Sequence, residues 1–226
     1  LQPDGQPMAF HDAVVGGRAV GTPGAIRMLE LAHQEHGKLA WAALFEPAIR
    51  LAEGGFKVSP RLNALLHNEK YLPADAQARA YFYTADGQPL PVGHVLKNPE
   101  YARVLRALAR DGSRALYEGE VAQAIVQKVR SHPTNPGLLT AQDLAGYQAK
   151  KREALCHDWP LPATALSASA RTYRICGFPP PSSGGIAVGQ ILGILAQTPA
   201  ARMPLDAQGL PTADWLHFYT EASRLA

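Results

Sequence analysis

The amino-acid sequence predicts an α+β fold that is mostly helical. Up to residue 146, apolar residues recur in segment after segment at the spacing of one buried helical face. From Tyr147 onward, two segments have the composition of strands. The 20 glycines and 19 prolines stand where helices are expected to begin and end. We therefore expect one partial domain over residues 1–226, with a mainly helical region at 1–146 and with strands, a proline-rich turn and further helices at 147–226.

The N-terminal segment is expected to run from loop into helix. Residues 1–15 are predicted as loop and residues 18–20 as a short strand. Thr22 followed by Pro23 predicts a helix start, because the hydroxyl can cap free amides and proline suits the first helical position. Gly37 is expected to end this helix in the left-handed conformation. The predicted buried face consists of Ile26, Leu29, Ala32 and His33.

Three further helices are predicted before residue 112. The first covers residues 40–53 and carries an apolar stripe, and Pro47 within it predicts a kink or a break into two shorter helices. Ser59 and Asn98 each precede a proline, so each is expected to cap a new helix. Residues 81–83 are predicted as a short strand that leads into a turn.

The later helices are predicted from apolar spacing and from capping residues. Apolar spacing indicates a helix over residues 121–129. Thr140 and Asp143 have the spacing of a capping box, although glutamate or glutamine is the usual partner at the second position. Thr212 is expected to cap a last helix, with Asp214 in the first turn.

A proline-rich turn connects predicted strands to an apolar helix. Strands are expected at residues 150–157 and 172–178, and neither strand nor helix can continue through the three prolines that follow. Ser182 or Ser183 is placed to cap the next helix, and the two glycines after them allow close approach of another backbone. The predicted buried face of this helix consists of Val188, Ile191, Leu192 and Leu195.

The charge and the hydropathy of the sequence argue against two classes of function, and its two cysteines leave two states open. The net charge of +3 is spread along the chain without basic runs, which argues against nucleic acid as a partner. No apolar run approaches the roughly 20 residues needed to span a bilayer. Cys156 and Cys176 could pair in an oxidising compartment or remain as two buried thiols. Spacing alone does not establish a bridge, so free thiols are the expectation.

Ser182 and Ser183 are the first candidates for a nucleophile. Serine chemistry needs a base within hydrogen-bond reach, and His157 and His217 are the nearest histidines in sequence. The surroundings lack the Gly-x-Ser-x-Gly pattern of a nucleophile elbow. A structural role as a helix cap is therefore the preferred interpretation of both serines.

The remaining candidates favour structural roles. His33 and His36 have helical spacing but no His-Glu-x-x-His pattern, so a solvated helix end is expected rather than a metal site. Arg18 lies in a glycine-rich stretch that could hold an anion, yet the phosphate-loop spacing is missing. Glu118 and Glu120 are interpreted as surface charges, and Trp41, Leu44 and Phe45 as core residues. The sequence thus predicts no catalytic, substrate-binding or metal-ligating residue and no cofactor.

Four ordered blocks nevertheless resemble the large subunit of the γ-glutamyltranspeptidases (glutathione hydrolases). The clearest is Pro-Pro-Pro-Ser-Ser-Gly-Gly at residues 179–185. The others are Gly-Arg-Ala-Val-Gly-Thr-Pro-Gly at 17–24, the stretch at 36–59, and Leu-Tyr-Glu-Gly at 116–119 together with residues 137–147.

The resemblance implies a partial large subunit of an N-terminal nucleophile hydrolase, a four-layer αββα sandwich. It implies a precursor that cleaves itself, and a small subunit whose N-terminal threonine attacks a γ-glutamyl substrate. The family's carboxylate-binding arginine is expected before Leu1 and its threonine after Ala226, so no catalytic residue carries over to a position here. Family members are usually exported, which implies a periplasmic or extracellular location.

Two alternatives stay open beside this interpretation. One is a related acylase that acts on cephalosporin side chains or poly-γ-glutamate. The other is a non-catalytic helical interaction module that kept the scaffold. A Thr-Thr-His cleavage site after Ala226 would favour an enzyme over the module.

Overall fold

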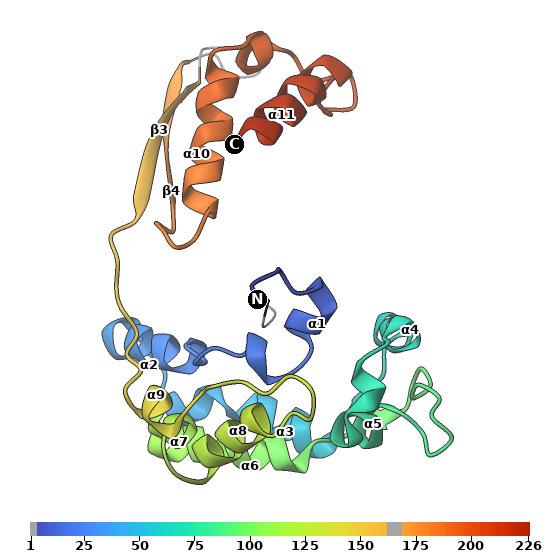
Figure 1. Ribbon diagram of the computed structural model, residues 1–226. Helices are drawn as coiled ribbons and strands as arrows, with labels where there is room; N and C mark the ends of the chain where they lie inside the picture. Colours follow the sequence, from blue (N-terminus) through green and yellow to red (C-terminus); the bar gives the residue numbers. More distant parts are fainter. Residues whose placement is uncertain (1–3, 162–168) are drawn as a thin grey trace. The chain divides into compact units, whose positions relative to one another are not determined.

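The computed structural model describes residues 4–161 and 169–226 of the chain (Figure 1). These residues form two compact units, the first ending at Ala149 and the second beginning at Lys150. Among the described residues, no helix has the length and apolar character needed to cross a membrane.

The first unit is mainly helical. Its α-helices are α1 (Phe10–Val14), α2 (Ala25–His36), α3 (Glu46–Gly54), α4 (Pro60–Asn68), α5 (Ala76–Phe82), α6 (Pro99–Asp111), α7 (Arg114–Tyr117), α8 (Gly119–Arg130) and α9 (Ala141–Ala145). Short 3-10 helices are η1 (Gly17–Ala19), η2 (Trp41–Leu44) and η3 (Leu72–Ala74). Strands β1 (Phe56–Lys57) and β2 (Val95–Leu96) pair antiparallel.

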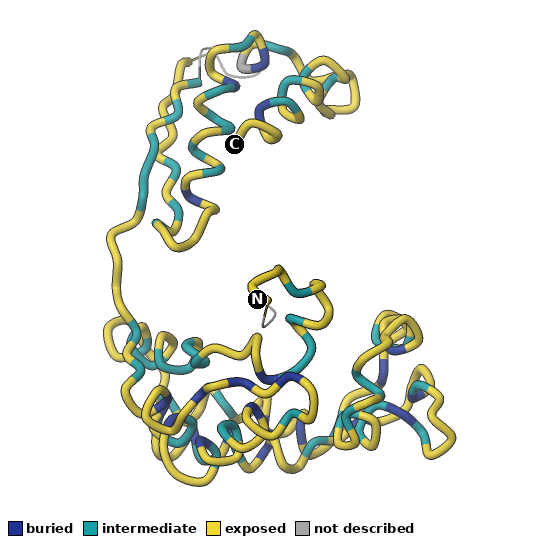
Figure 2. Tube along the Cα trace, viewed as in Figure 1, coloured by how far each residue is buried: buried dark blue, intermediate teal, exposed yellow. Residues whose placement is uncertain are grey.

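Three apolar clusters form the core of this unit, and Figure 2 shows their buried segments in dark blue. One joins α7, α8 and α9, a second joins α3 to α6, and a third surrounds the β1–β2 pair. Their buried members are, in that order, Tyr117, Ala122, Val129, Leu139 and Leu144; Ile49, Ala52, Ala102 and Leu105; and Val58, Leu90 and Leu96.

Several predicted helix starts are confirmed. The Ser59 hydroxyl accepts a hydrogen bond from the Leu62 amide, and the Asn98 side chain accepts one from the Tyr101 amide. Pro47 lies in the first turn of α3, so the predicted helix over residues 40–53 is broken into η2 and α3. Thr140 and Asp143 form the predicted capping box at α9. These starts depend on hydrogen bonds within a few residues, which a sequence pattern captures.

The N-terminal predictions were wrong in four details. Residues 10–14 form α1 instead of loop, and residues 17–19 form η1 instead of a strand, because the amides of Gly17 and Arg18 both donate to the Asn135 carbonyl. Thr22 caps nothing, since α2 begins only at Ala25 with Gly24 as its N-cap residue. Gly37 ends α2 with a φ of −64°, so the left-handed conformation is absent there.

The predicted strand at residues 81–83 was also wrong. Tyr81 and Phe82 belong to α5, whose start is capped by the Asp75 carboxylate accepting from the Ala78 amide. Only Tyr83 is extended, in a single bridge to Pro89. The cap at Asp75 favours helix locally and outweighs the strand preference of three aromatic residues.

The second unit consists of one β-hairpin and helices. Strands β3 (Leu155–Leu161) and β4 (Arg171–Gly177) pair antiparallel over seven residues each. Helices α10 (Gly184–Ala196) and α11 (Ala213–Leu225) and the 3-10 helix η4 (Pro199–Arg202) follow. Thr212 caps α11 as predicted, its hydroxyl accepting from the Trp215 amide. Helix α10 packs against both strands and against α11, with Leu195, Ala200 and Ala222 buried between the helices.

The expectation of two free thiols was wrong. Cys156 and Cys176 form a disulfide bond. The antiparallel register places the two residues directly opposite each other, and side chains at opposite positions point to the same face of a sheet. This register depends on the pairing of the whole hairpin, which the spacing of two cysteines does not reveal.

Candidate functional site

The turn at residues 179–185 joins β4 to α10 and leaves both serines exposed. Ser183 is the N-cap residue of α10, but its side chain makes no capping hydrogen bond. Its φ and ψ of −81° and −20° are helical, whereas a capping side chain needs the extended conformation to reach the free amides. The predicted serine cap was therefore wrong.

Gly185 has the predicted role of allowing close backbone approach, whereas Gly184 does not, because a side chain there would meet no atom closer than 3.9 Å. A side chain on Gly185 would meet the Phe178 carbonyl oxygen at 2.5 Å, and one on Gly177 would meet the Gly185 Cα at 3.0 Å. Because Gly177 and Gly185 have no side chains, α10 can lie directly on the end of β4.

His157 belongs to this helix–strand contact and not to a serine site. Its Nε2 lies 3.2 Å from the Gly185 carbonyl oxygen, and a side chain on Gly189 would collide with the ring at 2.2 Å. In the described part of the chain, neither Ser182 nor Ser183 has a hydrogen bond to a histidine. His217 lies on α11, where its ring contacts Phe218. The geometry provides no base for serine chemistry.

The other sequence candidates have structural partners. His33 Nε2 lies 2.8 Å from the Leu39 carbonyl oxygen, and its ring packs on Trp41, while His36 pairs with Glu35 at 3.5 Å. Arg18 Nε donates to Asn135 Oδ1 at 2.8 Å. Within residues 4–161 and 169–226, no group of three or more histidine, cysteine, aspartate or glutamate side chains is arranged to hold a metal ion.

The aromatic residues near α3 are largely packed, as predicted. Trp41 Nε1 donates to the Leu108 carbonyl at 2.8 Å, and its ring lies 5.0 Å from that of Phe45. Leu44 differs from the prediction, because it stays 47% exposed.

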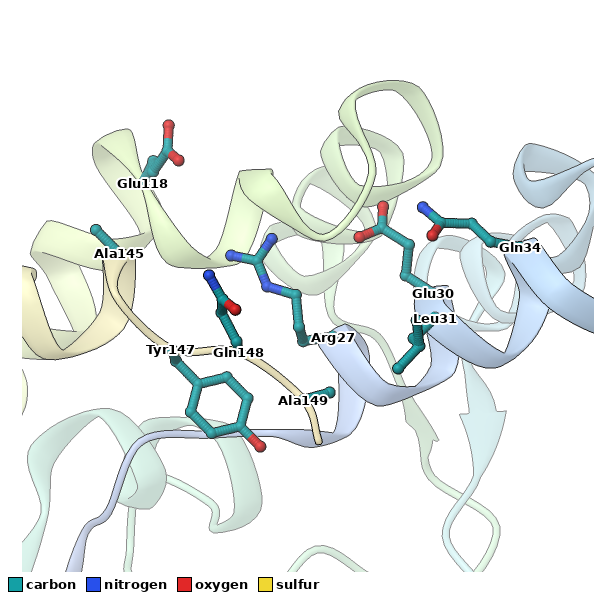
Figure 3. Close-up of a pocket in the computed structure, with 9 residues that line it drawn as sticks. All are labelled: Arg27, Glu30, Leu31, Gln34, Glu118, Ala145, Tyr147, Gln148 and Ala149. Carbon is teal, nitrogen blue, oxygen red and sulfur yellow. The ribbon is translucent and has the colours of Figure 1, made fainter. Parts of the chain in front are cut away.

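A pocket in the first unit brings together residues of which the sequence analysis singled out only Glu118, as a surface charge. It has a volume of about 410 Å³ and lies between α2, the end of α9 and the residues that follow α9 (Figure 3). Figure 3 shows the Arg27 guanidinium extending from α2 toward Gln148, with the Glu30 carboxylate on its other side. The lining residues are Arg27, Glu30, Leu31, Gln34, Glu118, Ala145, Tyr147, Gln148 and Ala149.

Two aromatic rings fix the Arg27 side of the pocket. The guanidinium carbon of Arg27 lies 4.4 Å from the centre of the Tyr117 ring, a cation–π geometry. Tyr117 is fully buried, donates its hydroxyl proton to the Pro23 carbonyl at 2.6 Å and stacks on Tyr147. Burial raises the pKa of Tyr117, while the amide and guanidinium of Arg27 act in the opposite direction. The phenol therefore stays neutral and serves as a rigid support.

The two acidic residues of the pocket differ in their surroundings. Both carboxylate oxygens of Glu30 accept hydrogen bonds from Ser113, one from its amide at 2.9 Å and one from its hydroxyl. Glu118 is exposed and precedes α8. No local sequence motif predicts this pocket, because its residues come from three segments that only the fold brings together.

The chain is similar over its length to known proteins. The sequence model of the gamma-glutamyltranspeptidase family matches residues 1–226. The glutathione hydrolase proenzyme of Escherichia coli (strain K12) is 32% identical over 210 residues, covering 92% of this chain and 33% of that protein. The acylase ACY 1 proenzyme of Pseudomonas sp. (strain V22) is 35% identical over 217 residues, covering 96% of this chain and 35% of that protein.

The fold agrees with the sequence comparison. The crystal structure of Helicobacter pylori gamma-glutamyltranspeptidase superposes with a TM-score of 0.80 at 26% identity, covering 99% of this chain and 59% of that one. The chain spans about a third of the length of the two curated relatives. Because the family model extends from the first residue to the last, the chain belongs to the gamma-glutamyltranspeptidase family.

Proposed function

We propose that the full-length protein containing this chain hydrolyses or transfers the γ-glutamyl group of glutathione and related compounds. The family match over residues 1–226 is the observation that supports this proposal. The relative from Escherichia coli, named a glutathione hydrolase proenzyme, agrees with it. The full-length protein is then made as a precursor and cleaved into two subunits.

In this proposal the chain is part of the large subunit and supplies scaffold. The nucleophile is an N-terminal threonine of the small subunit, whose own amine serves as the base. Residues 1–226 then form part of a single domain of the αββα sandwich type. Helix α10 supports that architecture, because it already covers one face of the β3–β4 hairpin.

We also propose a periplasmic or extracellular location. The disulfide between Cys156 and Cys176 supports it, since disulfides persist mainly in oxidising compartments.

The test is an assay of the purified full-length protein with a γ-glutamyl anilide. We expect release of the aniline, faster with glycylglycine as acceptor, and two bands in place of the precursor on a denaturing gel. A folded full-length protein that stays uncleaved and leaves the anilide intact would exclude the proposal and favour the non-catalytic module.

A second candidate is acylase activity toward another side-chain amide, such as that of a cephalosporin. The 35% identity to the acylase ACY 1 proenzyme favours including it. The same preparation, given a cephalosporin side-chain amide, distinguishes the two activities by the ratio of kcat/KM values. A higher kcat/KM for the cephalosporin amide would make acylase activity the assigned function in place of γ-glutamyl transfer. The proposed N-terminal threonine would remain the nucleophile.

A further inference from the structure

We propose that the pocket at Arg27 is a binding site for a small monocarboxylate with an aromatic or aliphatic body. The site lies within the first unit, and the proposal goes beyond the γ-glutamyl activity proposed above. Its ligand is defined by three observations, which concern the cation, the walls and the neighbouring acidic groups.

The cation is held in place but lacks an anionic partner. Arg27 Nε is buried and has no hydrogen-bond partner among the described residues. Arg50, Arg106 and Arg224 each pair with a glutamate, whereas Arg27 forms no such pair within the described part of the chain. The Tyr117 ring lies against the guanidinium and orients it. The ring accepts none of the hydrogen bonds that the N–H groups donate in the guanidinium plane. A partly buried guanidinium with free donors is suited to bind a planar carboxylate.

The walls suit an apolar body attached to that carboxylate. Leu31, Ala145 and Ala149 present aliphatic surface, and Tyr147 presents a ring that stacks on Tyr117. The volume of about 410 Å³ lies in the range of small-molecule sites, which is roughly 300–1,000 Å³. A compound the size of phenylacetate fits such a volume.

The acidic residues limit the ligand to one negative charge. Glu30 and Glu118 both line the pocket. A second carboxylate or a phosphate would be repelled by these groups, since like charges at short range are unfavourable. The side-chain amides of Gln34 and Gln148 are neutral hydrogen-bond donors and acceptors, so they do not repel a single carboxylate.

The experiment titrates the full-length protein with 4-fluorophenylacetate and follows its fluorine NMR linewidth. The neutral isostere 4-fluorophenylacetamide is the ligand control. We expect saturable broadening of the acid only, and Arg27→Gln should weaken binding at least about tenfold, since hydrogen bonds to charged groups contribute most to such contacts. Arg50→Gln is the matched protein control, because Arg50 is an exposed helical arginine paired with Glu46. It should leave the titration unchanged.

A second variant guards against misfolding of Arg27→Gln. Ala145→Leu adds volume to the pocket at an exposed position and keeps the cation. It should also weaken binding, while thermal unfolding and anilide turnover stay at the level of the unsubstituted protein. Equal broadening by acid and amide, no broadening at all, or binding that survives both variants would each overturn the proposal. The last result would place the carboxylate elsewhere, and none of the three depends on the γ-glutamyl assay.

Discussion

Asn135 joins two distant segments of the first unit through both its side chain and its backbone carbonyl. It is 4% exposed, and its Nδ2 donates to the carbonyls of Asp12 at 3.0 Å and Val15 at 2.9 Å. Its Oδ1 accepts from Arg18 Nε, and its backbone carbonyl accepts from the Gly17 and Arg18 amides. One residue therefore holds α1 and η1 against the loop that follows α8, and buried polar groups of this kind are costly to leave unpaired.

Replacing this residue tests that connection. Asn135→Ala removes the hydrogen bonds of this side chain and should lower the free energy of unfolding by about 2 kcal/mol. Asn68→Ala is the control, because Asn68 is exposed and makes one local bond to the Ala64 carbonyl. That control should stay within about 0.5 kcal/mol of the unsubstituted protein. Urea unfolding measures both, and equal midpoints would show that Asn135 is not a connecting residue.

At the scale of single elements, the capping box of α9 links a short helix to the core. The Thr140 amide donates to Asp143 Oδ2 at 2.9 Å, and the Asp143 amide donates to Thr140 Oγ1 at 3.1 Å. The cap fixes the start of a five-residue helix, and that helix places the fully buried Leu144 in the cluster formed with α7 and α8. The local cap and the tertiary packing thus support each other.

The cap should make stability depend on pH. Hydrogen bonds from the Thr140 hydroxyl and amide hold the pKa of Asp143 below its usual 3.8. A carboxyl group with a lowered folded-state pKa stabilises the fold fully above its unfolded-state pKa, and this contribution is lost as pH falls through the folded-state value. Asp143→Ala should therefore be less stable at pH 7, and its deficit should shrink below pH 3.8.

Urea midpoints between pH 7 and pH 2.5 provide the measurement. Thr140→Ser keeps the hydroxyl and should retain the pH dependence of the unsubstituted protein. A deficit of Asp143→Ala that is the same at both ends of the pH range would contradict an ionised cap.

At the scale of the whole molecule, the chain keeps large apolar side chains exposed on helices. On α2, Met28 and Leu29 are 49% and 48% exposed, and on α10, Ile186 and Val188 are 38% and 45% exposed. The spacing that predicts buried faces on these helices is present, but within the described residues little covers them. Such surface fits a chain that spans about a third of its curated relatives.

We predict that this chain, produced alone, has no γ-glutamyl hydrolase or transferase activity. An N-terminal nucleophile must be the first residue of its chain, and the side chain of Leu1 has no nucleophilic atom. An internal threonine keeps its amine in a peptide bond, so it lacks the base. A γ-glutamyl anilide assay decides this, with the full-length protein as the positive control. Turnover that follows the pure chain through successive purification steps would reveal an active site within residues 1–226.

The sequence by itself determined where several helices begin. Ser59, Asn98, Thr140 and Thr212 cap helices as predicted, and Pro47 separates two helices. Each depends on hydrogen bonds or sterics within four residues, so the pattern alone identifies it. The motif at residues 179–185 likewise indicated the family, although its serines do not cap.

Only the tertiary structure decided which distant groups meet. The disulfide needed the register of β3 on β4, and the pocket needed Arg27 of α2 to lie over Tyr117 of α7 and beside Tyr147. The 3-10 helix at residues 17–19 needed the carbonyl of Asn135. In each case the partners are separated by 20 residues or more along the chain. Their contact energy therefore depends on how whole elements pack, which no spacing rule within one segment contains.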